Sequence, residues 1–241
     1  SIPLPQPLAH RLINLLLHLS AALILLKVLE SLKLRGAFAA SLLFALHPAV
    51  VPTLFWPGYR SELVGLVFIL LSLFFAIRNR SSRDFLLAMV FSLISSLLHP
   101  AALALPLLAA LAIFYQNRSV HLHHYNRVLP LFCIALFAGV WTQSGQLEQT
   151  VATEEINAFT LVGQNLVFYL QQSFLPFTLQ LFHPFTDGQR YSVGATNSLL
   201  AFLVFIPFYV LIAFNFRKLW ARGILFGVTS FILLIIYGLL Q

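Results

Sequence analysis

The sequence predicts an all-α fold: a polytopic transmembrane bundle of about eight spans with one re-entrant or interfacial helix. Three observations predict it. Sixty percent of the 241 residues are apolar or aromatic, only 9% are charged, and the mean hydropathy is +0.90. Soluble domains carry about 25% charged residues, so the composition excludes a water-soluble globule. The net charge of +7 comes from few acids rather than many bases, which excludes a basic nucleic-acid-binding domain.

Apolar runs of roughly membrane-spanning length recur along the whole chain. A helix needs about 20 apolar residues to cross the hydrocarbon core, and shorter runs are tolerated by bilayer thinning or burial in a bundle. We therefore predict a single transmembrane domain over residues 1–241, which we expect to be the interior part of a longer protein. The predicted spans are Leu8–Leu26, Ala37–Phe55, Leu63–Ile77, Phe85–Leu98, Ala101–Tyr115, Val128–Trp141, Ser198–Phe214 and Gly223–Leu240.

One further apolar segment, Phe159–Phe182, is interrupted by several amide side chains and by Pro176. Amides disfavour contact with lipid, so we predict a re-entrant or interfacial helix here. This assignment also keeps the two loops that flank the segment on the same side of the membrane, as the charge distribution requires.

Most of the lysines and arginines fall in four clusters at alternate helix ends, which the positive-inside rule places in the cytoplasm. The other loops then face outward and carry most of the seven acids. We predict a multi-pass integral membrane protein, in a bacterial inner or plasma membrane rather than the endoplasmic reticulum. The clusters are Lys27, Lys33 and Arg35; Arg78, Arg80 and Arg83; Arg118 and Arg127; and Arg217, Lys218 and Arg222.

Polar side chains gather toward the predicted outer helix ends. His10, Asn14 and His18 recur every four residues and therefore share one face of the first helix. Together with groups on later helices they predict an outward-facing polar cavity, where a guanidinium would suit phosphate and an indole would suit a sugar ring or lipid. Alternatively, each side chain satisfies a neighbouring helix or reaches the interface singly. The later groups are His47, Trp56, Arg60, Glu62 and His99.

Three motifs carry a resemblance to a known family. The run from His10 through Asn14 to His18 fits the pattern H-x-x-N-x-x-x-H. A second run fits F-A-x-H-P-x-x-x-E-x-x-x-W-x-x-x-R-x-D-L, except that Pro52 stands in place of the glutamate. A third run fits Y-L-x-x-x-L-x-P…F-Y-P. They resemble the transmembrane and TPR-repeat O-mannosyltransferase-like family of the GT-C superfamily. The second run is Phe44–Leu63, matching at His47, Pro48, Trp56, Arg60 and Glu62; the third is Tyr169–Pro184.

The resemblance implies an inverting glycosyltransferase whose donor is a polyprenyl-phosphate-linked sugar. Arg60, with His99, would neutralise the lipid phosphate as it leaves. The family's catalytic acid lies in a loop that would precede Ser1, so no catalytic residue is assigned, although Glu154 or Glu155 offers a substitute. The sugar or the loop would be oriented by His10, Asn14, His47 and Glu62, and Trp56 would offer a flat face to the sugar ring or lipid.

An alternative is a non-catalytic GT-C-like subunit of a larger membrane complex. The chain has His99-Pro100 where the family often carries a lysine, which favours this reading. Whether the protein is an enzyme therefore stays open. Expected partners are membrane lipids, the lipid-linked sugar and other membrane proteins, without nucleic acid. No metal site is predicted and no role is assigned to a divalent metal, because the run His121-Leu122-His123-His124 is interpreted as a loop in contact with headgroups.

Overall fold

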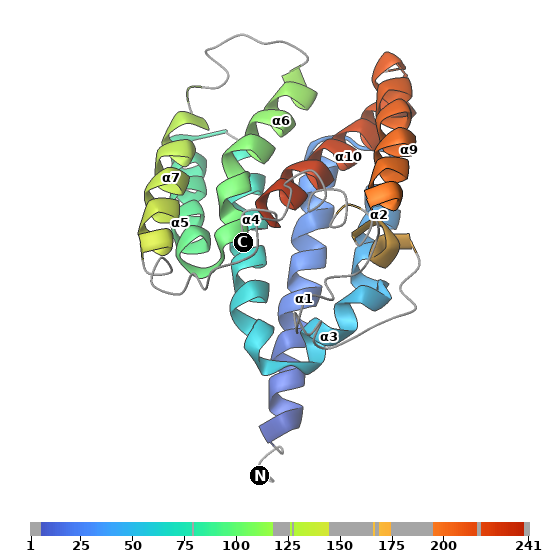
Figure 1. The fold of residues 1–241 in the computed structure, drawn as a ribbon. Coiled ribbons are helices and arrows are strands. Elements are labelled where there is room, and N and C mark those ends of the chain that lie inside the picture. The colour runs from blue at the N-terminus through green and yellow to red at the C-terminus, as the bar shows by residue number, and fades with distance from the viewer. Residues whose placement is uncertain are drawn as a thin grey trace. The chain divides into compact units, whose positions relative to one another are not determined.

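The computed structural model describes residues 6–78, 80–117, 126, 128–144, 166, 169–174, 195–215 and 218–238 (Figure 1). Every regular element in these residues is a helix, which confirms the all-α prediction. The chain divides into two compact units, Ser1–Glu148 and Gln149–Gln241. Whether one transmembrane domain spans both units stays a prediction.

The first unit contains six longer helices, one short helix and three 3-10 turns within the described residues. Their bounds are α1 (Gln6–Ser31), α2 (Ala37–Leu46), η1 (Pro48–Val50), α3 (Val51–Phe55), η2 (Pro57–Tyr59), α4 (Arg60–Arg78), α5 (Ser82–Leu98), η3 (Pro100–Ala104), α6 (Leu105–Asn117) and α7 (Val128–Ser144). In the second unit, α9 (Ala195–Phe214) packs against α10 (Leu219–Gly238), with 3.1 Å between the hydroxyl oxygens of Tyr209 and Thr229.

Two described helical stretches are long and apolar enough to cross a membrane: Leu8–Ser31 in α1, and Pro57–Arg78, which joins η2 to α4. A third follows if the bent pair Ala37–Leu46 and Pro48–Phe55 is one span. The count of eight spans therefore stays a prediction. Shorter apolar helices lie at four other predicted spans, over Ala101–Gln116, Val128–Ala138, Phe205–Phe214 and Gly223–Leu234.

Of the predicted interfacial segment Phe159–Phe182, the structure describes Leu166 and residues 169–174, which are helical. The rest of that segment lies outside the described residues, so its re-entrant course stays a prediction.

The outside of the first unit is apolar. Leu16 is 63% exposed and Phe38 is 68% exposed, and many other leucines and phenylalanines also face outward. Large exposed apolar surfaces are unfavourable in water but match lipid tails. Many buried positions instead hold small residues, which let helix backbones approach closely, as in membrane bundles. Among them are Ala21, Ser72, Ala88, Ser92, Ser95 and Ala109.

The predicted span Ala37–Phe55 is not one continuous helix. It ends at Leu46, turns through η1, and resumes as α3 with a bend of 47°. The cause is Pro48, which has no N–H for the helix and forces the residue before it out of the helical region. His47 is accordingly extended, with φ −65° and ψ 130°. A second break follows at Pro57, with Trp56 extended before it.

Both breaks leave carbonyl groups without their helical donors, and α1 supplies replacements. Helical pairing would join the Thr53 carbonyl to the N–H of residue 57, which is proline. The Asn14 amide donates instead to the carbonyls of Thr53, Leu54 and Trp56, at 3.2, 3.4 and 3.2 Å.

The first break is satisfied in the same way. In a continuous helix the Ala49 N–H would donate to the Ala45 carbonyl. Here it donates to His47 Nδ1 at 3.2 Å, so the Ala45 carbonyl has no helical donor. Nε2 of the buried His18 lies 3.2 Å from that carbonyl, and since a carbonyl only accepts, Nε2 carries the proton. Two of the three residues on the predicted polar face of α1, Asn14 and His18, therefore donate to broken backbone.

Helix α4 packs against α1 on one side and against α5 on the other. The Ser72 hydroxyl donates to the Ala88 carbonyl at 2.7 Å across the α4–α5 contact. Where α5 ends, a Cβ added to Gly65 would lie 2.6 Å from Cβ of His99. Only glycine therefore permits α4 to approach the turn after α5 this closely.

We predict that Asn14→Leu destabilises the first unit by about 1–3 kcal/mol, because carbonyls in apolar surroundings lose their donor. The measurement is thermal unfolding of the purified chain in detergent micelles. Ser20→Ala is the control, since the Ser20 hydroxyl bonds only its own helix at the Leu16 carbonyl. An Asn14→Leu protein that melts with the control would contradict this account.

We also predict that Gly65→Ala costs about 1–3 kcal/mol in the same assay, because its methyl group would overlap His99 and separate α4 from α5. The matched control is Gly227→Ala on α10, where an added Cβ meets nothing within 4 Å. That control should be neutral or stabilising, because alanine favours helix over glycine. Equal melting temperatures for the two variants would be the contrary result.

Candidate functional site

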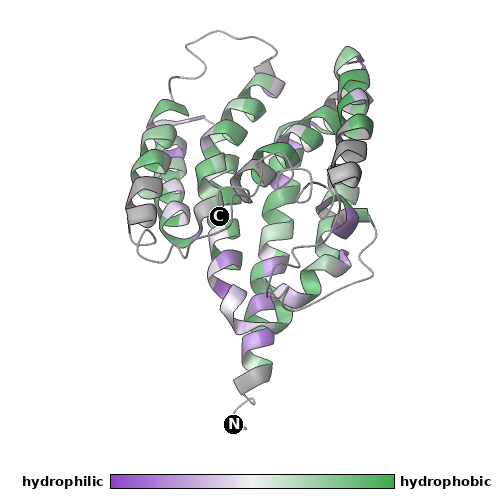
Figure 2. Cartoon of the chain, in the orientation of Figure 1, coloured by the Kyte–Doolittle hydropathy of each residue, from purple (hydrophilic) through white to green (hydrophobic). Residues whose placement is uncertain are grey.

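The polar residues predicted to lie together are at one end of the first unit. Helices α1, α2, α4 and α5 alternate in direction, so the start of α1, the α2–α4 connection and the end of α5 share an end (Figure 1). Hydrophilic residues mark the lower parts of α1 and α4 at this end (Figure 2). The basic cluster at Lys27–Arg35 and the cluster at Arg78–Arg83 lie at the opposite end, as the charge alternation predicts for this unit.

Arg60, the first residue of α4, joins two residues of α1. Its Nη2 lies 2.6 Å from Nδ1 of His10, and its Nε donates to Oδ1 of Asn14 at 3.5 Å. The three side chains form what we call the Arg60 cluster. Asn14 is 1% exposed and fixed by its bonds to the α3 carbonyls, so the guanidinium is positioned by a rigid neighbour.

The Arg60 cluster contains a cation that no carboxylate of the described residues neutralises. The ion pairs in the described part of the chain are Lys27–Glu30 at 3.0 Å and Arg78–Asp84 at 3.6 Å. Arg60 is in neither of them. Its guanidinium has five N–H groups, and the bonds to His10 and Asn14 use two.

Aromatic rings lie beside the Arg60 cluster. Trp56 is 41% exposed, and a Cβ added to Gly58 would lie 2.7 Å from its Nε1, so the indole lies directly against the glycine backbone. The Arg11 guanidinium carbon stands 4.7 Å from the centroid of the Phe55 ring. Trp56 is joined to the cluster through its backbone carbonyl, which accepts from the Asn14 amide, and its indole is exposed at the same end of the unit.

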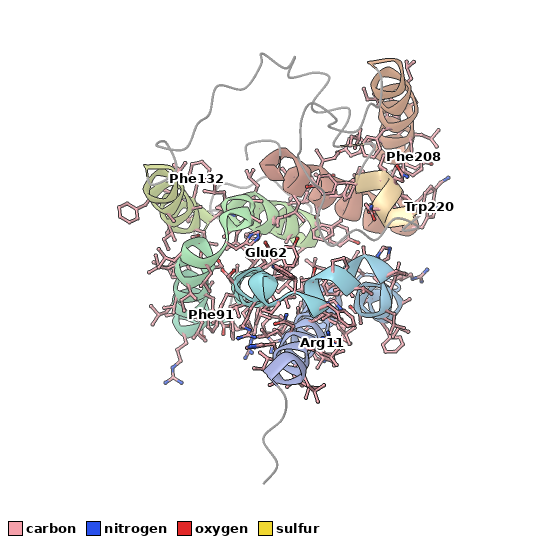
Figure 3. The ribbon with its side chains drawn as sticks, turned by 60° about the horizontal axis from the view of Figure 1, so that its bottom comes forward. Arg11, Glu62, Phe91, Phe132, Phe208 and Trp220 are labelled. Carbon is pink, nitrogen blue, oxygen red and sulfur yellow. The ribbon has the colours of Figure 1, made fainter. Side chains whose placement is uncertain are left out.

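Glu62 does not join this cluster. Both Arg60 and Glu62 are in α4, where two residues of separation place side chains about 160° apart around the axis. Arg60 bonds to α1, so Glu62 points away from α1, as Figure 3 shows. The predicted shared site for Arg60 and Glu62 is therefore divided between two faces. A carboxylate in the first turn also stabilises a helix N-terminus, which accounts for Glu62 structurally.

His99 is on the Glu62 side of α4, where its Cβ packs on Gly65. It caps η3: its Nδ1 accepts the Ala101 N–H at 3.0 Å, which leaves the proton on Nε2 of the neutral ring. Burial lowers the pKa of His99 from its ordinary value of 6.5. His99 is thus separate from Arg60, contrary to the joint role implied by the resemblance.

His47 likewise caps η1, with Nδ1 accepting the Ala49 N–H. Of the seven predicted site residues, the structure joins His10, Asn14 and Arg60 through side chains and brings in Trp56 through its carbonyl. No group of three or more His, Cys, Asp or Glu in the described chain could hold a metal ion. The candidate acids Glu154 and Glu155 and the run His121–His124 lie outside the described residues.

The acceptors of Asn14 and His18 were not predicted from the sequence. A signal was present in the prolines: Pro57 lacks the N–H that the Thr53 carbonyl would accept, and Pro48 ends the helix before Ala49 can pair with the Ala45 carbonyl. Gly65 was not predicted either, because its contact with His99 joins residues far apart in the sequence. Nothing in the local pattern around residue 65 predicts that contact.

Comparison of the chain with protein-family models, curated proteins and solved structures finds no match.

We predict that His99 makes stability depend on pH. Because burial lowers its pKa in the folded state, the unfolded chain binds this proton more tightly. The contribution of neutral His99 to the free energy of unfolding is full above about pH 6.5, and it is lost as the pH falls from there toward the lowered pKa. His99→Asn keeps a capping side chain but cannot titrate. Between about pH 8 and pH 5, its melting temperature should fall less than that of the native chain; equal falls would contradict the assignment.

Proposed function

We propose that this chain is a glycosyltransferase-like integral membrane protein that binds the phosphate of a polyprenyl-phosphate-linked sugar at Arg60. One observation carries the proposal: the guanidinium of Arg60 is held by two uncharged groups and has no carboxylate partner in the described residues. A cation at the end of an apolar bundle favours an anion there. Three of its N–H groups have no bond to the described residues and are available to a ligand.

The surroundings of Arg60 suit this ligand. Arg60 opens α4, so the positive end of the helix dipole adds to its attraction for phosphate. Arginine binds phosphate with two parallel hydrogen bonds, which fixes orientation as well as charge. The exposed indole of Trp56 offers a flat apolar face to a sugar ring or prenyl chain.

In the proposed reaction an acceptor hydroxyl attacks the anomeric carbon, and the bond from that carbon to the phosphate oxygen breaks. The lipid phosphate gains negative charge as it leaves, and Arg60 stabilises that charge. The hydroxyl proton passes to a general base, for which we assign no residue of the described chain. Asn14 acts as a positioning residue for the guanidinium.

The proposed topology has eight spans, with Phe159–Phe182 re-entrant. The Arg60 end faces outward, and the four basic clusters face the cytoplasm. The proposed location is a bacterial inner or plasma membrane. The apolar exterior of the first unit and its two to three candidate spans support membrane insertion.

A second candidate function is a non-catalytic subunit of a membrane complex. The observation that favours it is that Asn14, His18, His47 and His99 each bond to backbone groups at helix breaks. Most of the polar residues that resemble the family are therefore accounted for by the fold alone. Such a subunit would purify with partner chains in a fixed ratio.

The test is the affinity of the purified chain for a prenyl-phosphate sugar in detergent micelles. Arg60→Ala should weaken binding about 10- to 100-fold, because it removes a charged hydrogen-bonding partner of the phosphate. Arg11→Ala is the matched control: it removes the same charge from a neighbouring arginine that stacks on Phe55. Equal affinity for both variants and the native chain would reject the Arg60 site and favour the subunit.

A further inference from the structure

The contact between Arg60 and His10 fixes the protonation state of the histidine. Nη2 of Arg60 and Nδ1 of His10 are 2.6 Å apart. A guanidinium donates hydrogen bonds and accepts none, so Nδ1 must accept. His10 in this structure is therefore the neutral ring with its proton on Nε2.

Protonation of His10 at Nδ1 is incompatible with this contact. It removes the acceptor and sets an imidazolium directly against a guanidinium, with no carboxylate to compensate in the described surroundings. The titratable or charged groups nearest on α1 and on the elements packed against it are Arg11 and His18 on α1, His47 at the end of α2, Tyr59 on η2, and Arg60 and Glu62 on α4. The one acid among them, Glu62, is on the far face of α4.

A bound anion reverses this relation. A phosphate oxygen can replace Nδ1 of His10 as the acceptor of the hydrogen bond from Nη2 of Arg60. Nδ1 then has no donor. Nδ1 then binds a proton from solvent and donates it to a second phosphate oxygen. An imidazolium and a guanidinium, which would repel each other without an anion, become joint partners of one anion, with charge-assisted hydrogen bonds.

We propose that His10 is the second cationic ligand of an anion bound at Arg60, so that binding of a phosphodiester takes up one proton at Nδ1 of His10. This inference rests on the proposed function, since it assumes that the Arg60 cluster binds phosphate. It adds to that function a second ligand residue, the protonation state of that residue and a pH dependence of binding. A singly charged phosphodiester is neutralised by one of the two cations, and the other remains to stabilise charge that develops when the ester bond breaks.

The experiment is calorimetric titration of the full chain in detergent micelles with farnesyl-phosphate-glucose. A phosphodiester is the required probe, because a phosphate monoester takes up protons itself with a second pKa near 6. Titration in two buffers of different ionisation heat counts the protons bound. For the native chain we expect uptake approaching one proton, and affinity that rises as pH falls, by at most about tenfold per pH unit.

The matched variant is His10→Gln, whose side-chain carbonyl can still accept from Arg60 but cannot be protonated. It should bind the probe with affinity that is independent of pH and with no proton uptake. A native chain that binds the probe without proton uptake overturns the inference, and this result does not depend on the folding of any variant. Proton uptake by His10→Gln equal to that of the native chain also overturns it.

Arg60→Ala separates failure of this inference from failure of the proposed function. If Arg60→Ala binds as tightly as the native chain, or if the native chain does not bind the probe, the proposed function fails with it. If Arg60→Ala loses binding while the native chain takes up no proton, the Arg60 site stands and only the role of His10 is wrong.

Discussion

The structure depends on the requirement that carbonyl groups in apolar surroundings keep hydrogen-bond donors. Pro48 and Pro57 break the chain between α2 and α4 and remove helical donors close together. In lipid no water replaces them, so each orphan carbonyl would cost several kcal/mol. Asn14 and His18, one turn apart on α1, supply the missing N–H groups. The breaks and the polar face of α1 therefore require each other.

This requirement also determines what the site can do. Asn14 is held by the carbonyls after α3, and its remaining oxygen accepts from Arg60. The guanidinium is thus positioned by uncharged groups rather than by a carboxylate, which leaves its charge available for an external anion. An acid in place of His10 or Asn14 would position Arg60 equally well but would cancel that charge. The polar groups consequently serve two purposes: they complete the backbone, and they hold in place a cation that no carboxylate of the described residues neutralises.

The sequence was sufficient for features that depend on local spacing. Hydropathy predicted helices at the described spans, and the four-residue spacing put His10, Asn14 and His18 on one face. Prediction failed where a proline or the geometry of a helix overrides the apolar pattern. The span Ala37–Phe55 bends because His47-Pro48 overrides its apolar pattern. Glu62 and His99 separate from Arg60 because α4 begins at Arg60, so that helical geometry rather than a flexible turn sets their directions.

The central claim is that Asn14 replaces the donor that Pro57 lacks, and a double-mutant cycle tests it most directly. Pro57→Ala returns an N–H that can reach the Thr53 carbonyl, so the amide of Asn14 becomes less necessary. We predict that Asn14→Leu costs about 1 kcal/mol less in the Pro57→Ala background than in the native chain, measured by unfolding in the same micelles. Equal costs in the two backgrounds would show that Asn14 does not substitute for the missing donor and would contradict the account.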